Sequence, residues 1–172
     1  MIAPLQIFTE RFVLRPLVES DVTMQYLLWL NQDKAKKFIT TAASINSLSK
    51  LREYVADKNQ CNDVLFLGIF DKENGLHIGN IKYEPVNIIL RYAVMGILIG
   101  DSTFRGKGIA IEVVLASSAW LKENYNINQI LLGVSSENSE AVRAYHRAGF
   151  KETDTPFIHK YKDNYLLMAL QI

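Results

Sequence analysis

Cysteine, proline and unbalanced charge are all scarce in this sequence. Its 172 residues include one cysteine, Cys61, and four prolines, and 19 basic residues are nearly matched by 18 acidic ones. A single cysteine cannot form an internal disulfide, so we expect a reducing compartment. The net charge of +1 argues against a nucleic-acid binder that relies on overall positive charge, and no nucleic-acid partner is expected.

Long apolar runs are missing as well. No stretch approaches the roughly 20 apolar residues that span a bilayer, and the first residues, MIAPLQIFTER, lack the basic start and long apolar core of a signal peptide. We therefore expect a cytoplasmic protein without a membrane partner. Because apolar residues still make up 49% of the chain, residues 1–172 are expected to form a single domain whose core needs no metal.

Hydrophobic periodicity predicts strands and helices along the whole chain. Strands are expected at Ile7–Leu14, Val64–Phe70, Ile78–Tyr83, Tyr92–Ile99, Ile130–Ser135, Phe157–Tyr161 and Tyr165–Leu170, with Pro16 ending the first. Helices are expected from Ser20 or Asp21 to Leu30, from about Ser47 to Lys58, from the glycines near residue 106 to about Asn124, and from Asn138 to Ala148. The second and third strands should form a hairpin through the turn Asp71–Gly75.

The segment AVMGILIGDSTFRGKGIAI, residues 93–111, carries the strongest functional signal. An apolar strand passes through a polar turn to Gly106 and Gly108, which flank Lys107 where a helix should begin. The unpaired N–H groups of a helix N-terminus and the helix dipole both favour a bound anion, and glycines leave no Cβ in its way. The sequence therefore predicts that the N–H groups of residues 106–110 bind phosphate.

Two familiar phosphate loops do not fit this segment. A Walker loop needs four residues between its first glycine and the Gly-Lys pair, followed by Ser or Thr. Here five residues separate Gly100 from Gly106, and Gly108 takes the hydroxyl position. The dinucleotide-binding pattern needs Gly or Ala three residues after its second glycine, where this chain has Ile111. A nucleotide-dependent phosphotransferase is therefore a disfavoured alternative.

The pattern that remains, Arg105-x-x-Gly108-x-Ala110 after a strand, resembles the pyrophosphate loop of the GNAT superfamily of acyl-CoA-dependent N-acetyltransferases. A second segment, QILLGVSSENSEAVRAYHRAGF, resembles the same superfamily. In that superfamily a strand, an asparagine, a short helix with a tyrosine seven residues after the asparagine, and then Gly-Phe follow in order. Asn138 and Tyr145 occupy those positions. Two matches in the right order identify the chain as a member.

The resemblance implies an α/β (α+β) GNAT fold, in which a mixed, mostly antiparallel sheet of six or seven strands is flanked by about four helices. It also implies acetyl-CoA as the co-substrate and no metal. Main-chain groups of the strand before the loop would bind the pantetheine arm where that strand splays from its neighbour, and Asn138 would bind the arm, cap its own helix, or both. The residues implied in cofactor binding are Leu98, Ile99, Gly100, Arg105, Gly106, Lys107, Gly108, Ile109, Ala110 and Asn138.

Acetyl transfer needs an amine with a free lone pair and is helped by a proton for the departing thiolate. The resemblance assigns the general acid to Tyr145, whose alternative role is an aromatic side chain packed on the sheet. The base stays open, because the strand 130–135 has no carboxylate where relatives that acetylate protein N-termini often carry a glutamate. Glu84 is the nearest candidate. His146, His159 or an ordered water are alternatives, since proximity supplies much of the rate.

The half of the chain expected to bind the acceptor is less diagnostic. The segments TERFVLRPL and IGNIKYEPVN are similar to the branch that contains ribosomal-protein N-terminal acetyltransferases and related acetyltransferases of small amines and amino sugars. Trp29 and Asn31 are the expected acceptor wall, and core packing is the alternative for Trp29. Lys34, Lys36 and Lys37 would attract a phosphate or nucleotide attached to the acceptor.

These features favour a small amine or an amino sugar over a peptide N-terminus as the acceptor. The protein is expected to be a monomer or a homodimer. An inactive acyl-CoA-binding module remains as an alternative because of the missing strand carboxylate, although the intact Asn138 and Tyr145 argue against it.

Overall fold

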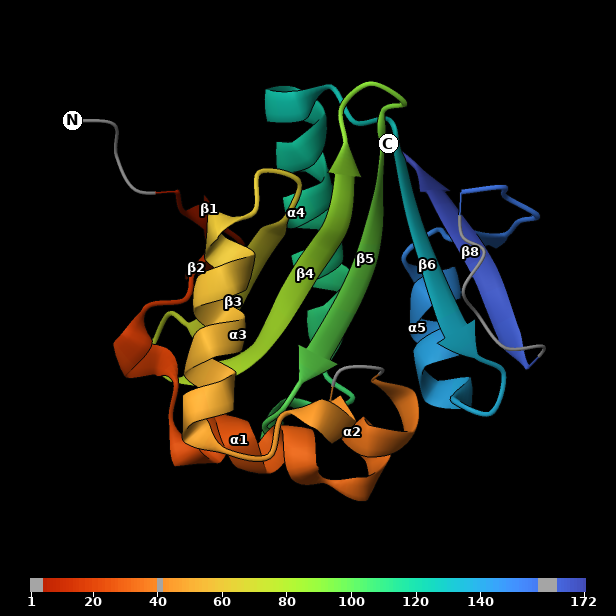
Figure 1. The fold of residues 1–172 in the computed structure, drawn as a ribbon. Helices are drawn as coiled ribbons and strands as arrows, with labels where there is room; N and C mark the ends of the chain where they lie inside the picture. The colour runs from red at the N-terminus through yellow and green to blue at the C-terminus, as the bar shows by residue number, and fades with distance from the viewer. Residues whose placement is uncertain (1–4, 40–41, 158–163) are drawn as a thin grey trace.

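The computed structural model describes residues 5–39, 42–157 and 164–172 (Figure 1). Within these residues the strands are β1 (Ile7–Phe8), β2 (Phe12–Pro16), β3 (Leu65–Asp71), β4 (His77–Asn87), β5 (Tyr92–Ile99), β6 (Gln129–Ser135), β7 (Lys151–Glu152) and β8 (Tyr165–Gln171). The α-helices are α1 (Met24–Asn31), α2 (Asp33–Phe38), α3 (Leu48–Gln60), α4 (Ile109–Tyr125) and α5 (Ser139–Arg147). Three short 3₁₀ turns are η1 (Glu19–Asp21), η2 (Ala42–Ser44) and η3 (Ser102–Phe104).

All of these strands belong to one sheet, in the order β1-β2-β3-β4-β5-β6-β8-β7. Every neighbouring pair is antiparallel except β5 and β6, which are parallel. The expected mixed, mostly antiparallel sheet is therefore confirmed. In the described part of the chain it has eight strands rather than six or seven, and five α-helices rather than about four. The elements that were not expected are short: β7 has two residues and α2 has six.

The first predicted strand is broken in two, which corrects the single strand Ile7–Leu14. The N–H of Thr9 donates to the carbonyl of Phe12 at 2.9 Å, and the N–H of Phe12 donates to Thr9 Oγ1 at the same distance. These two bonds close a tight turn, so β1 and β2 pair with each other as an antiparallel hairpin. Pro16 is the last residue of β2 rather than the residue that stops it.

The first helix begins later than predicted. Neither Ser20 nor Asp21 is its cap, because Asp21 accepts a hydrogen bond from the N–H of Val18 and pairs with Arg15 at 2.7 Å. Thr23 instead caps α1, and its hydroxyl accepts from the N–H of Tyr26 at 3.2 Å. Because the Asp21 carboxylate makes these two contacts outside the helix, α1 begins a few residues later than predicted.

The remaining predicted elements are largely confirmed. The β3–β4 hairpin closes with Gly75 at φ +71°, and β5, β6, β8, α3, α4 and α5 lie close to their expected bounds. Gly149 follows α5 with φ +100°, as expected for a left-handed residue after a helix. Of the predicted strand Phe157–Tyr161, only Phe157 is described, and it lies in a turn. The rest of that strand lies outside the described residues.

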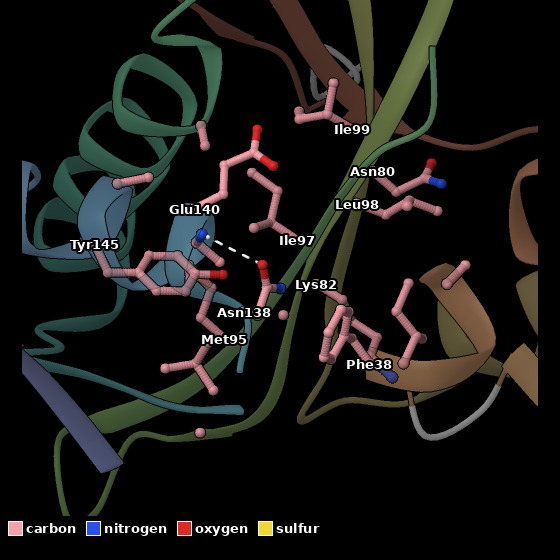
Figure 2. Close-up of a pocket in the computed structure, with 18 of the residues that line it drawn as sticks. Phe38, Asn80, Lys82, Met95, Ile97, Leu98, Ile99, Asn138, Glu140 and Tyr145 are labelled. Carbon is pink, nitrogen blue, oxygen red and sulfur yellow. Dashed lines mark hydrogen bonds between the residues drawn. The ribbon is translucent and has the colours of Figure 1, made fainter. Parts of the chain in front are cut away.

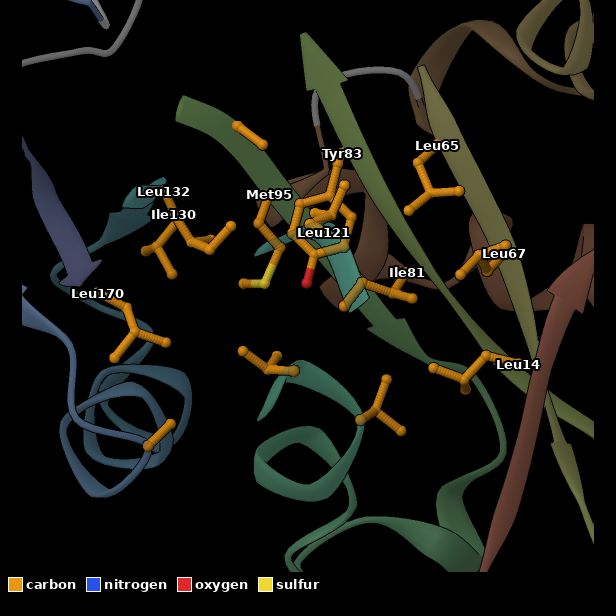
Figure 3. Packing of buried hydrophobic residues seen from close by; sticks show 14 of the residues in the cluster. Leu14, Leu65, Leu67, Ile81, Tyr83, Met95, Leu121, Ile130, Leu132 and Leu170 are labelled. Carbon is orange, nitrogen blue, oxygen red and sulfur yellow. The ribbon is translucent and has the colours of Figure 1, made fainter. Parts of the chain in front are cut away.

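Helices cover both faces of the sheet and create two hydrophobic cores. On one face, α4 and α5 pack over a cluster that includes Tyr83 and Leu121 (Figure 3). The hydroxyl of Tyr83 is fully buried but lies 2.8 Å from Ser117 Oγ on α4, so it keeps a hydrogen bond. On the other face, α1 and α3 pack around Trp29 and Leu51.

Trp29 of α1 packs on the backbone directly after β5. A Cβ built on Gly100 would lie 2.0 Å from Trp29 Cδ2, a distance that no side chain tolerates. Trp29 itself is only 2% exposed, so its ring cannot move aside into solvent. The glycine is therefore required by packing, and the contact holds α1 against the end of the strand that leads to the glycine loop.

Replacing Gly100 by alanine should destabilise the fold by about 1–3 kcal/mol, the usual cost of overpacking a core. Gly96→Ala, within the preceding strand β5, is the matched control, because a Cβ there meets no heavy atom within 4 Å. Urea denaturation of both variants, with the m-value checked, measures the difference in the free energy of unfolding. Equal stabilities would show that the Trp29 ring does not constrain this position.

Candidate active site

The two parallel strands at the centre of the sheet separate along their length. β5 and β6 pair only through Tyr92–Val94 and Gln129–Leu131. Beyond these residues β5 continues with β4 up to Ile99, while β6 continues with β8 up to Ser135, so the two strands diverge (Figure 1). On its β6 side, β5 is therefore unpaired with any described strand from Met95 to Ile99, and its backbone N–H and C=O groups there can bind a ligand. This agrees with the splay that the resemblance implied.

The diverging strands enclose a cleft of about 1240 Å³. Its walls come from β4, β5 and β6, from the loop before α4, and from residues of α1, α2, α3 and α5 (Figure 2). The predicted site residues that line it are Glu84, Leu98, Ile99, Arg105, Gly106, Gly108, Ile109, Ala110, Asn138 and Tyr145. The predicted residues that do not line it are Trp29, Asn31, Gly100 and Lys107.

The glycine loop presents an open backbone to the cleft. Gly106 and Gly108 have φ values of +73° and +74°, a region that favours glycine, and nothing lies within 4 Å of where their Cβ atoms would be. Gly108 is the N-cap of α4 and supplies no capping side chain. Within the described residues, the N–H groups of residues 106–110 have no acceptor. The loop therefore combines free donors with a helix N-terminus, as an anion site requires.

Arg105 holds this loop against the strand before it. Its guanidinium donates to the carbonyls of Ile99 and Gly100, at 3.0 and 3.1 Å. The side chain thus links the two ends of the turn. Lys107 does not line the cleft but a separate small hollow, where its ammonium lies 5.8 Å from the ring centre of Phe104.

The start of α4 is anchored from outside by Glu112. Its carboxylate accepts from the backbone N–H of Arg11 at 2.8 Å and from Thr9 Oγ1 at 2.6 Å, and it pairs with the Arg11 guanidinium at 2.7 Å. Burial would raise the pKa of Glu112, but these hydrogen bonds outweigh it and lower the pKa below the usual value. The carboxylate stays ionised near neutral pH and fixes the helix N-terminus to the β1–β2 turn.

Asn138 and Tyr145 both reach the cleft from the β6–α5 segment. Asn138 Oδ1 caps α5 by accepting from the N–H of Ala141 at 3.4 Å, as the dashed line in Figure 2 shows. The half-buried ring of Tyr145 lies 5.7 Å from that of Phe150, and its hydroxyl points toward the side of the cleft where Asn138 and Ile97 lie (Figure 2). Tyr145 therefore both packs on the core and presents a hydroxyl to the cleft.

Glu84 lies between two lysines. Lys82 Nζ is 2.6 Å from one carboxylate oxygen, and Lys58 Nζ hydrogen-bonds the other. Burial would raise the pKa of Glu84, but the two ammonium groups outweigh it and hold the pKa below its usual value. A carboxylate with both oxygens engaged and a low pKa is a weak proton acceptor, so this environment argues against the expected role of Glu84 as general base.

The expected acceptor wall is differently composed. Trp29 is buried against Tyr26 and His77, and the amide of Asn31 donates to the carbonyl of Leu27 at 2.9 Å within its own helix. Tyr26 and Trp29 lie three residues apart on one face of α1 and are both 2% exposed, but Tyr26 lines the cleft and Trp29 does not.

Other residues on the β4 side of the cleft were not predicted from the sequence. Lys82 and Asn80 alternate with buried residues on β4, which reads as an ordinary polar strand face, and α2 was not expected. Lys36 and Lys37 line the cleft as predicted, and Lys37 pairs with Glu137 at 2.8 Å, whereas the side chain of Lys34 lies outside the described part. The lining residues on this side that were not predicted are Tyr26, Leu30, Phe38, Tyr54, Asn80 and Lys82.

A family model described as acetyltransferase (GNAT) domain matches residues 11–151. The chain belongs to the GNAT acetyltransferase family. This enzyme therefore transfers an acetyl group from acetyl-CoA to an amine nitrogen. Among curated proteins, no sequence matches the chain significantly.

Solved structures share the fold at low sequence identity. The ribosomal-protein α-N-acetyltransferase RimL, solved with coenzyme A, has a TM-score of 0.84 at 17% identity over 98% of both chains. A spermidine N-acetyltransferase chimera, SpeG from Vibrio cholerae with hSSAT, has 0.75 at 21% identity, covering 94% of this chain and 96% of that one. The microcin self-immunity acetyltransferase MccE, solved with acetyl-CoA and AMP, has 0.78 at 17% identity, covering 95% and 93%.

In the described part of the chain, no helix combines the length and the apolar character needed to cross a membrane. Among the same residues, no group of three or more His, Cys, Asp and Glu side chains is placed to hold a metal ion.

Replacing Gly108 by valine should weaken acetyl-CoA binding by about tenfold or more, which corresponds to ~1.4 kcal/mol or more. A β-branched residue would occupy the open space before α4 and disturb the donors there. Gly75→Val is the matched control, because Gly75 has φ +71° and the same empty surroundings in a remote hairpin. Calorimetry should show weakened binding for the first variant alone. Unchanged affinity in Gly108→Val would show that the glycine loop does not bind the cofactor.

Proposed function

We propose that this enzyme acetylates a small primary amine, with an amino sugar as the favoured class, and that acetyl-CoA binds between β5 and β6. The observation that carries the proposal is the open edge of β5 facing Tyr145 across one cleft. The pyrophosphate would bind the N–H groups of residues 106–110, and the pantetheine arm would pair with the backbone at Leu98 and Ile99. Asn138, at the N-terminus of α5, would contact the same arm.

The acceptor would enter beside β4, where the wall is partly aromatic. Tyr26 from α1, Phe38 from α2 and Tyr54 from α3 line this part of the cleft, and the half-buried rings of Phe38 and Tyr54 can pack on a sugar ring. A ring of this size fits a local pocket, whereas a peptide would need an extended groove with carboxylates for its charged N-terminus. Such carboxylates are scarce here.

Charge also disfavours a polyamine acceptor. The described residues that line the cleft include six basic side chains and two acidic ones, Glu84 and Glu140. Glu84 is already neutralised by two lysines. A polycation would therefore meet net positive charge, although the SpeG relative acts on spermidine.

Tyr145 would act as the general acid. The amine nitrogen attacks the thioester carbonyl carbon, and the C–S bond then breaks. The departing sulfur takes the hydroxyl proton of Tyr145, which regains a proton from solvent. A thiol such as that of CoA has a pKa of about 8.5. Its thiolate is therefore already a reasonable leaving group, and the proton transfer assists its departure.

The proton released by the amine needs an acceptor other than a dedicated base. Among the described residues that line the cleft there is no histidine or aspartate, and Glu84 is held by lysines. We assign no role as base to Glu140, the second carboxylate of the lining. Water in contact with the unpaired carbonyls of β5 can take this proton. Positioning of amine and thioester in one cleft then supplies most of the rate.

Tyr145→Phe should lower kcat by about 10²-fold, the lower end of general-acid effects, with little change in the KM for acetyl-CoA. The hydroxyl matters most when the thiolate departs, so binding of the ground state should not change. Tyr125→Phe, on the exposed side of α4, is the matched control and should retain full activity. A Tyr145→Phe enzyme with wild-type kcat would exclude Tyr145 as the acid.

The acceptor class is tested by measuring CoA release with glucosamine, spermidine and a short peptide bearing a free N-terminus. We expect kcat/KM to be highest for glucosamine. The peptide is the second candidate because the fold is shared with RimL. A clear preference for the peptide or for spermidine would overturn the amino-sugar assignment, and binding of acetyl-CoA with no turnover of any amine would favour the inactive module.

A further inference from the structure

Three charged side chains form one group on the acceptor side of the cleft. Glu84 hydrogen-bonds Lys58 through one oxygen and Lys82 through the other, and Lys82 Nζ is 2.9 Å from the hydroxyl oxygen of Tyr54. The side chains of Lys58 and Lys82 are each 22% exposed, so the group is largely shielded from solvent. Two ammonium groups share one carboxylate, and the group carries a surplus positive charge.

Lys82 is the member of this group whose positive charge faces the cleft. Lys82 lines the cleft (Figure 2), whereas Lys58 is not among the described residues that line it. Burial would lower the pKa of Lys82, but its hydrogen bonds to Glu84 and Tyr54 outweigh this and raise it. Lys82 therefore stays protonated at neutral pH, at a place where a charge is screened less than on the open surface.

There is room for a ligand beside Lys82. Gly96 is its register partner on β5, is exposed, and would place a Cβ with no heavy atom within 4 Å. The other acidic residue lining the cleft, Glu140, belongs to α5 and is drawn on the Tyr145 side of the cleft in Figure 2. Within the described residues, the carboxylate that pairs with Lys82 is Glu84.

A neighbouring amide adds a second donor to this strand face. Asn80 lies two residues before Lys82 and is 5% exposed. His77 Nε2 is 2.9 Å from Asn80 Oδ1 and from the carbonyl of Gly79, two acceptors, so this nitrogen carries the hydrogen. The amide oxygen of Asn80 is thus occupied, while its Nδ2 has no partner among the described residues.

We propose that the acceptor of this enzyme carries an anionic group, a phosphate or a carboxylate, and that Lys82 is the residue that selects it. The proposal rests on the proposed function and narrows it from small amines to anionic ones. Lys82 would hold the anion through a charge-assisted hydrogen bond, and the space over Gly96 would admit it. The residue binds the acceptor and takes no part in the proton transfers.

The test compares amines that share one ring. Glucosamine is neutral apart from its amine, glucosamine 6-phosphate adds a phosphate, and muramic acid adds a carboxylate. We expect kcat/KM for at least one anionic sugar to exceed that for glucosamine by about 10-fold or more, the effect of a hydrogen bond to a charged group. The two anionic probes distinguish phosphate from carboxylate.

Lys82→Met should abolish this preference, and Lys82→Arg should retain most of it. The methionine variant is expected to fold, because Glu84 keeps Lys58 as a partner. Lys122→Met, on the exposed end of α4, removes the same charge outside the cleft and should leave the preference unchanged. Acetyl-CoA affinity, measured by calorimetry, should be the same in all four proteins.

Several results would overturn the inference. These are an equal or higher kcat/KM for glucosamine, a preference that survives in Lys82→Met, or turnover of none of the three sugars by a protein that binds acetyl-CoA. Weaker acetyl-CoA binding in Lys82→Met would instead show that the charge of Lys82 binds the cofactor, and this would reject the inference. Failure of the wild-type protein to bind acetyl-CoA would refute the proposed function itself, and this inference with it.

Discussion

The pairing of β5 with β6 lasts for three residues on each strand, and the cleft depends on where it stops. After Val94 and Leu131, β5 stays with β4 and β6 stays with β8. Each strand keeps its other partner, so the sheet loses only one ladder of hydrogen bonds. In return, the edge of β5 is exposed inside the protein rather than at its border, with α5 carrying Tyr145 on the opposite wall. An unpaired strand edge of this kind is a ready binding surface for a chain of amides.

The opening is held in shape by contacts that lie outside it. Arg105 binds the two carbonyls after β5, Trp29 packs on Gly100, and Glu112 links the start of α4 to Arg11. These contacts fix the turn and the helix N-terminus before any ligand arrives. The donors of the glycine loop are therefore preorganised, and a ligand does not have to supply the cost of ordering them.

The two ends of the cleft are built differently, which explains why the sequence predicted them unequally. The end proposed to bind the cofactor presents backbone groups and glycines with positive φ, and such positions leave a residue signature at fixed spacing. Gly106, Gly108 and Asn138 could therefore be singled out from sequence motifs. The end proposed to bind the acceptor is lined by side chains from α1, α2, α3 and β4 that lie far apart in the chain. No spacing relates Tyr26 to Lys82, and so only the fold brings them together.

The sequence by itself determined the strand–loop–helix that faces the cleft, because this follows from local periodicity and turn chemistry, and the resemblance of its two motifs indicated the family and the mostly antiparallel sheet. The tertiary structure decided which side chains of each element line the cleft. Tyr26 and Trp29 pack in the same hydrophobic cluster, yet of the two it is Tyr26 that also lines the cleft, since the docking of α1 on the sheet sets which ring lies at the cleft wall. It likewise gave Glu84 two lysine partners, one from α3 and one from β4. The electrostatic environment of a side chain depends on its neighbours in space, and a local sequence pattern does not encode these neighbours.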